Sequence, residues 1–263
     1  MPTLTSEDGT NIAWEKVGNG PPVVLVDGAT CFRDSGPMRP IAQQLAGQFS
    51  VYLYDRRGRG ASGDAAAFAV EREIEDIHGL ILAAGGTASV FGISSGAALV
   101  LRAAEKLGPS AITHMALYEP PFAPEDEAWA ADDYTTALNA ALSSGDRGEA
   151  VEAFLRRVGM PPEAIAGMRQ APMWSGMEAI APTLAYDNAA MGDSRVPADL
   201  AARVRVPSLC MAGGASPESL QYGSRALAEL IPNAAIEILE NQTHDVSAEV
   251  LGPVLARFFS RQT

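Results

Sequence analysis

Short runs of apolar residues alternate along this chain with longer stretches whose apolar residues recur at helical spacing. In residues 70–84, for example, Ile74, Ile77 and Ile81 fall on one helix face. Apolar strands that alternate with helices are typical of a doubly wound, mostly parallel sheet with helices on both faces. The predicted strands are residues 3–5, 11–14, 23–26, 51–54, 89–91, 115–118, 209–211 and 236–239, the first two forming a hairpin around Asp8-Gly9. The predicted helices are residues 40–49, 70–84, 97–107, 219–230 and 251–259.

The alternation of predicted strands and helices is interrupted between residues 124 and 200, where no apolar run resembles a strand. This stretch shows helical spacing at residues 134–143 and 149–158. Because it stands between two predicted strands, we expect a helical insertion into a core domain formed by residues 1–123 and 201–263. Ligands of doubly wound sheets bind beyond the carboxyl ends of the strands, so the insertion is placed to act as a lid there. The alternative is an insertion that makes no contact with the site.

The composition narrows the class of protein. The 263 residues are 47% hydrophobic, which is enough for one sizeable core. A net charge of −13 repels nucleic acids and anionic membranes, so neither is an expected partner. Two cysteines, Cys31 and Cys210, are too few for a disulfide scaffold. Neither a membrane span nor a signal peptide is recognised, so a cytoplasmic location is expected. The oligomeric state stays open, a homodimer included.

The most specific motif is Gly-x-Ser-x-Gly at residues 92–96, with Ser94 at its centre. It follows the apolar run at residues 89–91 and precedes the helical run that starts at Ala97. A turn this tight between a strand and a helix strains its central residue, and the glycines let the two elements approach. The turn would present the Ser94 hydroxyl at the carboxyl edge of the sheet, at a helix N-terminus that stabilises negative charge. Ser94 is therefore the candidate nucleophile, and a glycine-rich turn without function is the alternative.

A serine hydroxyl needs a neighbouring base to lose its proton near neutral pH, and the chain holds three histidines. His78 lies in a predicted helix, on or near its solvated face. His114 directly precedes a predicted strand and would lie at the edge of the sheet opposite Ser94. His244 follows the last predicted strand and so shares the carboxyl edge with Ser94. We therefore expect His244 to be the base.

These motifs resemble those of the α/β-hydrolase superfamily, in the branch that carries a helical cap after the sixth strand. The resemblance rests on residues 92–96, on the arginine-rich turn at residues 54–63 and on the His244 loop, and it spans nearly the whole chain outside the insertion. It implies an eight-stranded sheet and the chain order serine, acid, histidine. It also implies an oxyanion hole made of two backbone amides, which by position are those of Ala29 and Ser95. The arginine-rich turn is expected to brace neighbouring loops.

The chain departs from the family pattern at two places. The loop after the third strand usually begins His-Gly, whereas here it reads Asp27-Gly28, which adds a negative charge near the pocket. The acid usually follows the seventh strand, where this chain has Ser216. Relatives such as the haloalkane dehalogenases carry the acid after the sixth strand instead, and Glu119 fills that position here. Glu119 is thus the expected acid, while Glu218 or the lack of any carboxylate partner are the alternatives.

Together these features predict a serine hydrolase that cleaves a carboxylic ester, thioester or lactone through an acyl-enzyme. Its partner would be a small-molecule acyl substrate, and no metal or cofactor is expected. Dehalogenases and epoxide hydrolases of the superfamily use an aspartate at the position of Ser94 and are disfavoured. Perhydrolysis, C–C bond hydrolysis and acyl transfer use the same serine and stay open. The alternative from another class is a non-hydrolytic ligand-binding or lyase/cyclase protein on the same scaffold.

Overall fold

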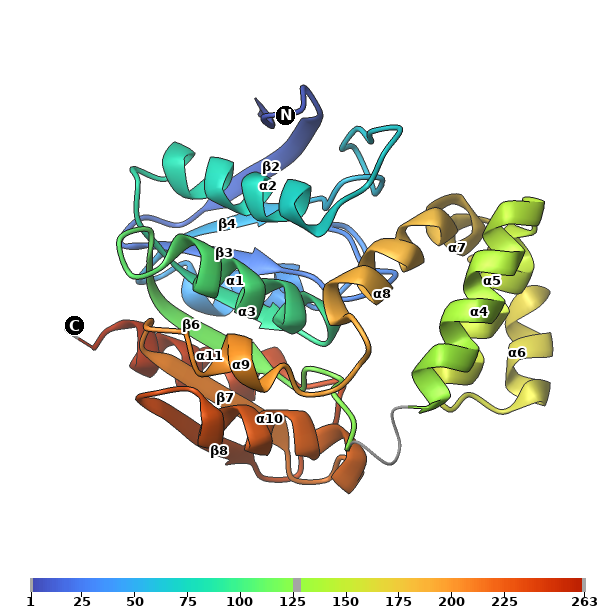
Figure 1. Cartoon of the computed structure of the whole chain (residues 1–263). Helices are drawn as coiled ribbons and strands as arrows, with labels where there is room; N and C mark the ends of the chain where they lie inside the picture. Colours follow the sequence, from blue (N-terminus) through green and yellow to red (C-terminus); the bar gives the residue numbers. More distant parts are fainter. Residues whose placement is uncertain (1, 125–128, 262–263) are drawn as a thin grey trace.

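Eight strands form one sheet in the order β1-β2-β4-β3-β5-β6-β7-β8, in a computed structural model that describes residues 2–124 and 129–261 (Figure 1). Strands β1, β2 and β4 pair antiparallel in turn, and the remaining neighbours pair parallel. The strands span Thr3–Thr5 (β1), Asn11–Val17 (β2), Pro22–Val26 (β3), Ser50–Tyr54 (β4), Ala88–Ile93 (β5), Ile112–Tyr118 (β6), Ser208–Gly213 (β7) and Ala234–Leu239 (β8). The predicted class, a doubly wound and mostly parallel sheet, is confirmed.

Helices cover both faces of the sheet because its central strands are apolar on both sides. Every residue of β4, β5 and β7 is buried. Successive strand residues point to opposite faces, so Val24 packs in the cluster with α2, α3 and α10, and Leu25 packs in the cluster with α1 and α11. These helices span Met38–Leu45 (α1), Val70–Ala83 (α2), Ser95–Leu107 (α3), Glu218–Leu230 (α10) and Ala248–Phe259 (α11).

The direction of winding reverses at β3. The next strand in the sequence, β4, lies on one side of β3, and β5 lies on the other side. In open α/β sheets such a reversal leaves a crevice at the carboxyl ends of the two diverging strands, and ligands bind in it. The segments that leave the sheet at this reversal begin with Asp27 after β3 and Ser94 after β5.

The segment predicted as an insertion is mostly helical where the structure describes it. Its helices are α4 (Trp129–Ser144), α5 (Arg147–Arg157), α6 (Pro162–Arg169), α7 (Trp174–Ile180), the short 3-10 helix η2 (Ala181–Thr183), α8 (Leu184–Met191) and α9 (Ala198–Ala201). Helices α4 to α7 share an apolar cluster with η2 and with Leu184 of α8, and Ala29 of the core packs against this cluster. Helices α4 to α7 stand off one side of the core in Figure 1. Helix α8 also packs against α3, as does α9. The boundaries at residues 124 and 200, and the role as a lid, stay predictions.

Two details differ from the expectations. His114 lies inside β6 rather than before it, because this strand begins at Ile112. Its ring is buried edge-on against Phe258, and this burial lowers the pKa of His114. The helix expected over residues 40–49 begins earlier and ends at Leu45, since the chain turns into β4 directly afterwards.

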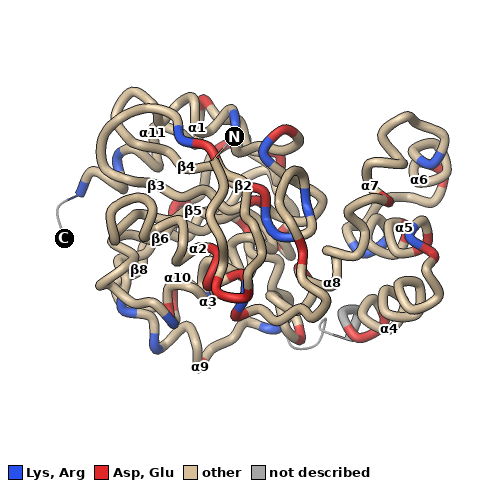
Figure 2. The backbone as a smooth tube through the Cα atoms, turned by 90° about the horizontal axis from the view of Figure 1, so that it is seen from above, with Lys and Arg blue, Asp and Glu red and all other residues tan. Residues whose placement is uncertain are grey.

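Charged residues of both signs lie close together on the core and on helices α5 and α6 (Figure 2). On these two helices Arg156 pairs with Glu149 and Glu152, and Arg169 pairs with Glu152 as well. The excess of acids therefore does not leave these helices as a surface of one sign. In the two described ranges, no helix has the length and apolar content that crossing a bilayer requires.

Candidate active site

Ser94 occupies a sharp turn between β5 and α3. Its φ of 56° and ψ of −131° form a conformation that residues other than glycine rarely adopt. The Ser94 N–H donates to the carbonyl oxygen of Tyr118 at 2.9 Å and so ties the turn to the end of β6. A Cβ added at Gly92 would lie 2.5 Å from the carbonyl oxygen of Gly96, and one added at Gly96 would lie 2.5 Å from that of Asp27. These close approaches require glycine at both positions.

His244 and Glu119 are joined by a hydrogen bond of 2.7 Å between Nδ1 and Oε2. The second carboxylate oxygen, Oε1, accepts the N–H of Gly213 at 2.8 Å. The carboxylate is fully buried, whereas the His244 side chain is 38% exposed. Burial raises the pKa of Glu119, but the hydrogen bonds from His244 and Gly213, together with the nearby Ser216 hydroxyl, outweigh it and lower this pKa below its usual value. Glu119 is therefore ionised near neutral pH, which places the proton of a neutral imidazole on Nδ1.

Tyr118 connects the segments that carry Ser94 and His244. Its carbonyl oxygen accepts the Ser94 N–H, and its phenol donates to the carbonyl oxygen of Thr243 at 2.6 Å. Ser94 and Glu119 lie at the ends of paired strands, since Ile93 at the end of β5 is in register with Tyr118. In the described parts of the chain no hydrogen bond joins Ser94 to His244 directly. The two side chains are thus placed at one edge of the sheet without being in direct hydrogen-bond contact.

The loop after β3 passes directly beside Ser94. A Cβ added at Gly28 would lie 3.1 Å from the Cβ of Ser94, so Gly28 leaves room for the serine. Within the described ranges neither the amide of Ala29 nor that of Ser95 donates a hydrogen bond to another group of the chain. Thr30 has a φ of 61°, which is unusual for a β-branched residue, and its hydroxyl donates to the carbonyl oxygen of Ala29 at 2.7 Å.

The family of this chain is identified by comparison with known protein families. The family model described as "Alpha/beta hydrolase family" matches residues 19–250. The chain belongs to the alpha/beta hydrolase family. Among solved structures, an alpha/beta hydrolase from Sphaerobacter thermophilus is 50% identical, with 98% of this chain and 100% of that chain covered and a TM-score of 0.88.

More distant matches agree with the fold of this alpha/beta hydrolase. A thermophilic esterase from Thermogutta terrifontis is 22% identical, with 98% of this chain and 99% of the other covered and a TM-score of 0.72. The enol-lactonase from Burkholderia xenovorans is 22% identical, with coverage of 99% and 100% and a TM-score of 0.69. A curated relative, the uncharacterized hydrolase YraK of Bacillus subtilis, is 36% identical over 97 residues, which is 35% of either chain.

Asp27 stands where the alpha/beta hydrolase pattern usually has histidine. Its side chain is buried, and among the described residues its Oδ1 has no hydrogen-bond partner. Burial raises the pKa of Asp27 to about 7, although the charges of Arg59 and Arg56 oppose this. Burial thus favours the protonated carboxyl and weakens the negative charge expected here from the sequence. Burial likewise raises the pKa of the nearby Cys31 thiol to about 12, so this cysteine is not an activated nucleophile.

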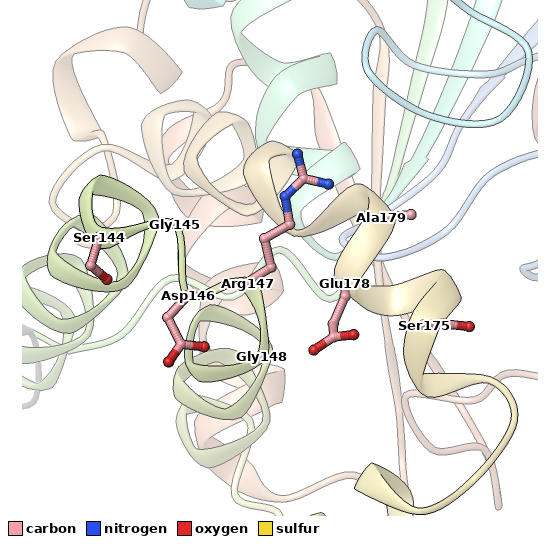
Figure 3. Close-up of a pocket in the computed structure, with 8 residues that line it drawn as sticks. All are labelled: Ser144, Gly145, Asp146, Arg147, Gly148, Ser175, Glu178 and Ala179. Atoms are coloured by element: carbon pink, nitrogen blue, oxygen red, sulfur yellow. The ribbon is translucent and has the colours of Figure 1, made fainter.

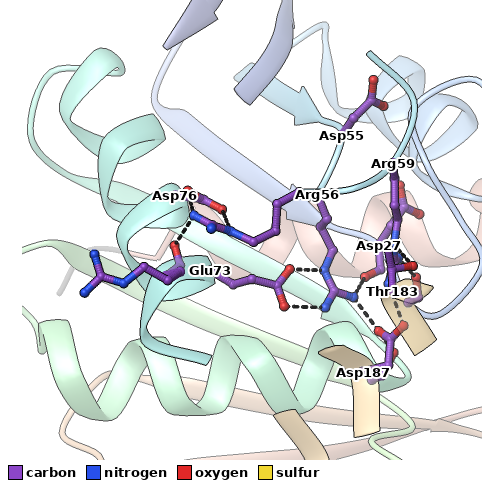
Figure 4. Close-up of polar contacts among 12 residues, drawn as sticks. Asp27, Asp55, Arg56, Arg59, Glu73, Asp76, Thr183 and Asp187 are labelled. Atoms are coloured by element: carbon purple, nitrogen blue, oxygen red, sulfur yellow. Dashed lines mark hydrogen bonds and ion pairs between the residues drawn. The ribbon is translucent and has the colours of Figure 1, made fainter. Parts of the chain in front are cut away.

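The arginine-rich turn after β4 is buried and paired with acids (Figure 4). Arg56 makes two hydrogen bonds with Glu73, at 2.7 and 2.8 Å. Arg59 donates to the carbonyl oxygen of Gly28 at 2.6 Å and to that of Cys31 at 3.2 Å. The guanidinium groups thus brace the loop after β3, in agreement with what the resemblance implies for this turn.

One residue that the sequence did not single out contacts this network. Asp187 of α8 is buried and accepts hydrogen bonds from Ser95, Arg56 and Arg59. The sequence gives little sign of this role, because Asp187 is one acid within a helix. Its hydrogen-bond partners lie 92 to 131 positions away in the sequence.

Of the other residues considered in the sequence, Ser216 lies close to the Glu119–His244 pair, whereas Glu218 and His78 make no hydrogen bond with His244 in the described ranges. Glu218 is exposed at the start of α10, and in the described residues it makes no contact with the histidine. Ser216 is buried in the turn after β7, close to Glu119. His78 lies partly exposed on α2. None of the described residues form a group of three or more His, Cys, Asp or Glu that could hold a metal ion.

A cleft of about 660 Å³ opens elsewhere, between the α4–α5 turn and α7 (Figure 3). Its lining includes Asp146, Arg147 and Glu178, all from the helical segment that stands off the core. No candidate catalytic residue lines it, so this cleft is separate from the site at Ser94.

Proposed function

We propose that this alpha/beta hydrolase is a serine hydrolase that cleaves a carboxylic ester, thioester or lactone through an acyl-enzyme. The observation that carries the proposal is the hydrogen bond from His244 to the buried Glu119, at the edge of the sheet where a strained turn presents Ser94. A serine nucleophile needs an imidazole whose tautomer and orientation are fixed, and an ionised carboxylate on Nδ1 supplies both.

Each step then uses groups of this chain. Ser94 Oγ attacks the carbonyl carbon of the substrate while its proton passes to Nε2 of His244, the nitrogen that carries the free lone pair. The carbonyl oxygen becomes an oxyanion, which accepts hydrogen bonds from the amides of Ala29 and Ser95. The bond to the leaving alcohol or thiol then breaks, and the leaving group takes the proton from Nε2. Water then gives a proton to Nε2 of His244 and attacks the acyl carbon, the bond to Ser94 Oγ breaks, the carboxylic acid leaves, and Oγ takes the proton back from Nε2.

The lack of a direct hydrogen bond between Ser94 and His244 is compatible with this scheme. Catalytic hydrogen bonds of ligand-free enzymes are often long, and they shorten once a substrate is bound. The same observation also favours the second candidate, a non-hydrolytic ligand-binding or lyase/cyclase protein, which needs no proton transfer from Ser94. The esterase and the enol-lactonase among the structural relatives are in line with the first candidate.

Turnover of p-nitrophenyl acetate, a thioester and a simple lactone separates the two candidates. Replacement of the nucleophile in Ser94→Ala is expected to lower kcat by about 10³-fold or more on the accepted substrate. Ser110→Ala is the matched control, because Ser110 is exposed in the loop before β6 and should keep full turnover. A folded wild-type protein that hydrolyses none of the three, or a Ser94→Ala variant with wild-type turnover, would favour the non-hydrolytic candidate.

A further inference from the structure

The carboxylate of Asp187, on α8, lies against Arg56 and Arg59 of the buried arginine-rich turn (Figure 4). Its Oδ1 accepts the Ser95 hydroxyl at 2.8 Å and Nη1 of Arg56 at 2.6 Å. Its Oδ2 accepts Nη2 of Arg59 at 2.5 Å. One side chain from the helical insertion is thus bonded to three groups of the core.

Arg59 connects Asp187 to the peptide that carries the first amide, the N–H of Ala29. Nη1 of Arg59 donates to the carbonyl oxygen of Gly28 at 2.6 Å. This carbonyl and the N–H of Ala29 belong to one planar peptide unit, so the hydrogen bond to its oxygen fixes the direction of its N–H. It also polarises the peptide and makes that N–H a better donor. Asp187 in turn holds the guanidinium in the position from which it makes this bond.

The hydroxyl of Ser95 connects Asp187 to the residue that carries the second amide, the N–H of Ser95. Ser95 is the first residue of α3, and its N–H has no carbonyl partner within the helix. The hydroxyl of the same residue is bonded to Asp187, which restricts the rotation of the residue that carries this N–H. Arg56 supports the arrangement from behind, because its Nη1 donates both to Asp187 and to the carbonyl oxygen of Asp27, at 3.1 Å.

The charges in this network are compatible with an oxyanion nearby. Burial raises the pKa of Asp187, but the charges of Arg59 and Arg56 and the Ser95 hydroxyl outweigh it, so the carboxyl is ionised. Arg56 is also paired with Glu73, so the two guanidinium groups balance two carboxylates, and Arg59 is bonded directly to the Gly28–Ala29 peptide. The oxyanion would therefore meet a donor backed by a cation.

We propose that Asp187 is a positioning residue that holds both amides of the oxyanion hole in line and makes α8 of the insertion part of the catalytic machinery. This rests on the serine hydrolase function proposed above. Its effect belongs to the transition state, because the amides bind the oxyanion more strongly than the neutral carbonyl of the substrate.

The test compares Asp187→Asn with Asp76→Asn in steady-state hydrolysis of p-nitrophenyl acetate. Asp76 is equally buried and binds Arg57 through two hydrogen bonds of 2.8 Å, but this pair does not touch the loop after β3. For Asp187→Asn we expect kcat to fall about 10- to 100-fold with KM within about twofold, whereas Asp76→Asn keeps kcat within about threefold. Thermal midpoints of both variants show how far each loses stability.

Ser95→Ala is a milder second variant, because it removes one hydrogen bond and keeps both arginine pairs. We expect a several-fold lower kcat at unchanged KM. Wild-type kcat in both Ser95→Ala and folded Asp187→Asn would overturn the inference. It would also be overturned if kcat fell in proportion to the loss of thermal midpoint to the same extent in Asp187→Asn and in Asp76→Asn. A wild-type protein without turnover is a different result, because it overturns the proposed function and this inference together.

Discussion

Glu119 and His244, 125 residues apart in the sequence, meet through a 2.7 Å hydrogen bond at the carboxyl edge of the sheet. The second oxygen of Glu119 accepts the N–H of Gly213, so each carboxylate oxygen faces a donor. Glu119 has a φ of 44°, and a strained conformation of this kind persists only where the surroundings fix it. The geometry thus depends on a carboxylate at this position, because it must accept on both sides.

Glu119→Gln should lower kcat by about 10²- to 10⁴-fold with little change in KM. The amide of glutamine must turn its NH₂ group toward either His244 or the N–H of Gly213, so one donor loses its acceptor. The measurement is the hydrolysis of the best ester substrate by the folded variant. Glu218→Gln serves as the control and should keep wild-type rates, because Glu218 is exposed. Full activity in Glu119→Gln combined with loss in Glu218→Gln would reassign the acid.

Gly96→Ala should destabilise the protein by about 3 kcal/mol. The added Cβ would lie 2.5 Å from the carbonyl oxygen of Asp27, where backbone rather than a flexible side chain is in the way. Gly167→Ala in α6 is the matched control, since a Cβ there meets nothing within 4 Å and alanine favours a helix. Urea unfolding of both variants checks this. Equal stabilities of the two would argue against a tightly packed turn at Ser94.

Asp27→Asn should change the pH dependence of stability. Between pH 3.8 and about 7 the folded protein holds a proton on Asp27 that the unfolded chain has released. The free energy of unfolding of the wild type therefore falls as the pH rises through this window, by up to about 1.4 kcal/mol per unit. The asparagine variant lacks this titration, so its stability relative to the wild type should rise by about 2 kcal/mol between pH 5 and pH 7.

Urea unfolding at several pH values measures this difference, and the other titrating groups cancel because both proteins share them. The two curves should run parallel only above about pH 8, where the folded wild type has also released this proton. A difference that stays constant from pH 5 to pH 8 would mean that the Asp27 carboxyl is not perturbed in the folded protein.

Much of the fold could be predicted because the central strands are apolar on both faces and the helices are periodic. The segment Val70–Ala83, for instance, carries its buried residues at helical spacing, and its predicted and observed ends differ by one residue. The sequence does not predict that β6 includes His114, because Thr113 and His114 are polar residues near the start of this strand. The buried surroundings of His114 come from Phe258, which belongs to a helix at the other end of the chain and leaves no local pattern.

The candidate site, like the fold, could be predicted from the sequence only where the signal is local. The turn around Ser94 has a local signature, since Gly92 and Gly96 are needed for close approaches within a few residues and to the neighbouring loop. The pairing of Glu119 with His244 was expected only through the order of elements in the family. The contact of Asp187 with Ser95 and Arg59 could not be predicted, because it depends on how α8 packs on α3. That packing is a tertiary arrangement that no spacing in the sequence encodes.

The most direct measurement is covalent labelling with a fluorophosphonate probe, followed by mass spectrometry of the digested protein. The proposed serine hydrolase mechanism predicts a single adduct, on Ser94, in the wild type and in the control His78→Asn, whose histidine lies on α2. In His244→Asn the rate of labelling should fall by about 100-fold or more, because the base that accepts the serine proton is gone. An adduct on another residue, no adduct on folded wild-type protein, or an undiminished rate in His244→Asn would contradict it.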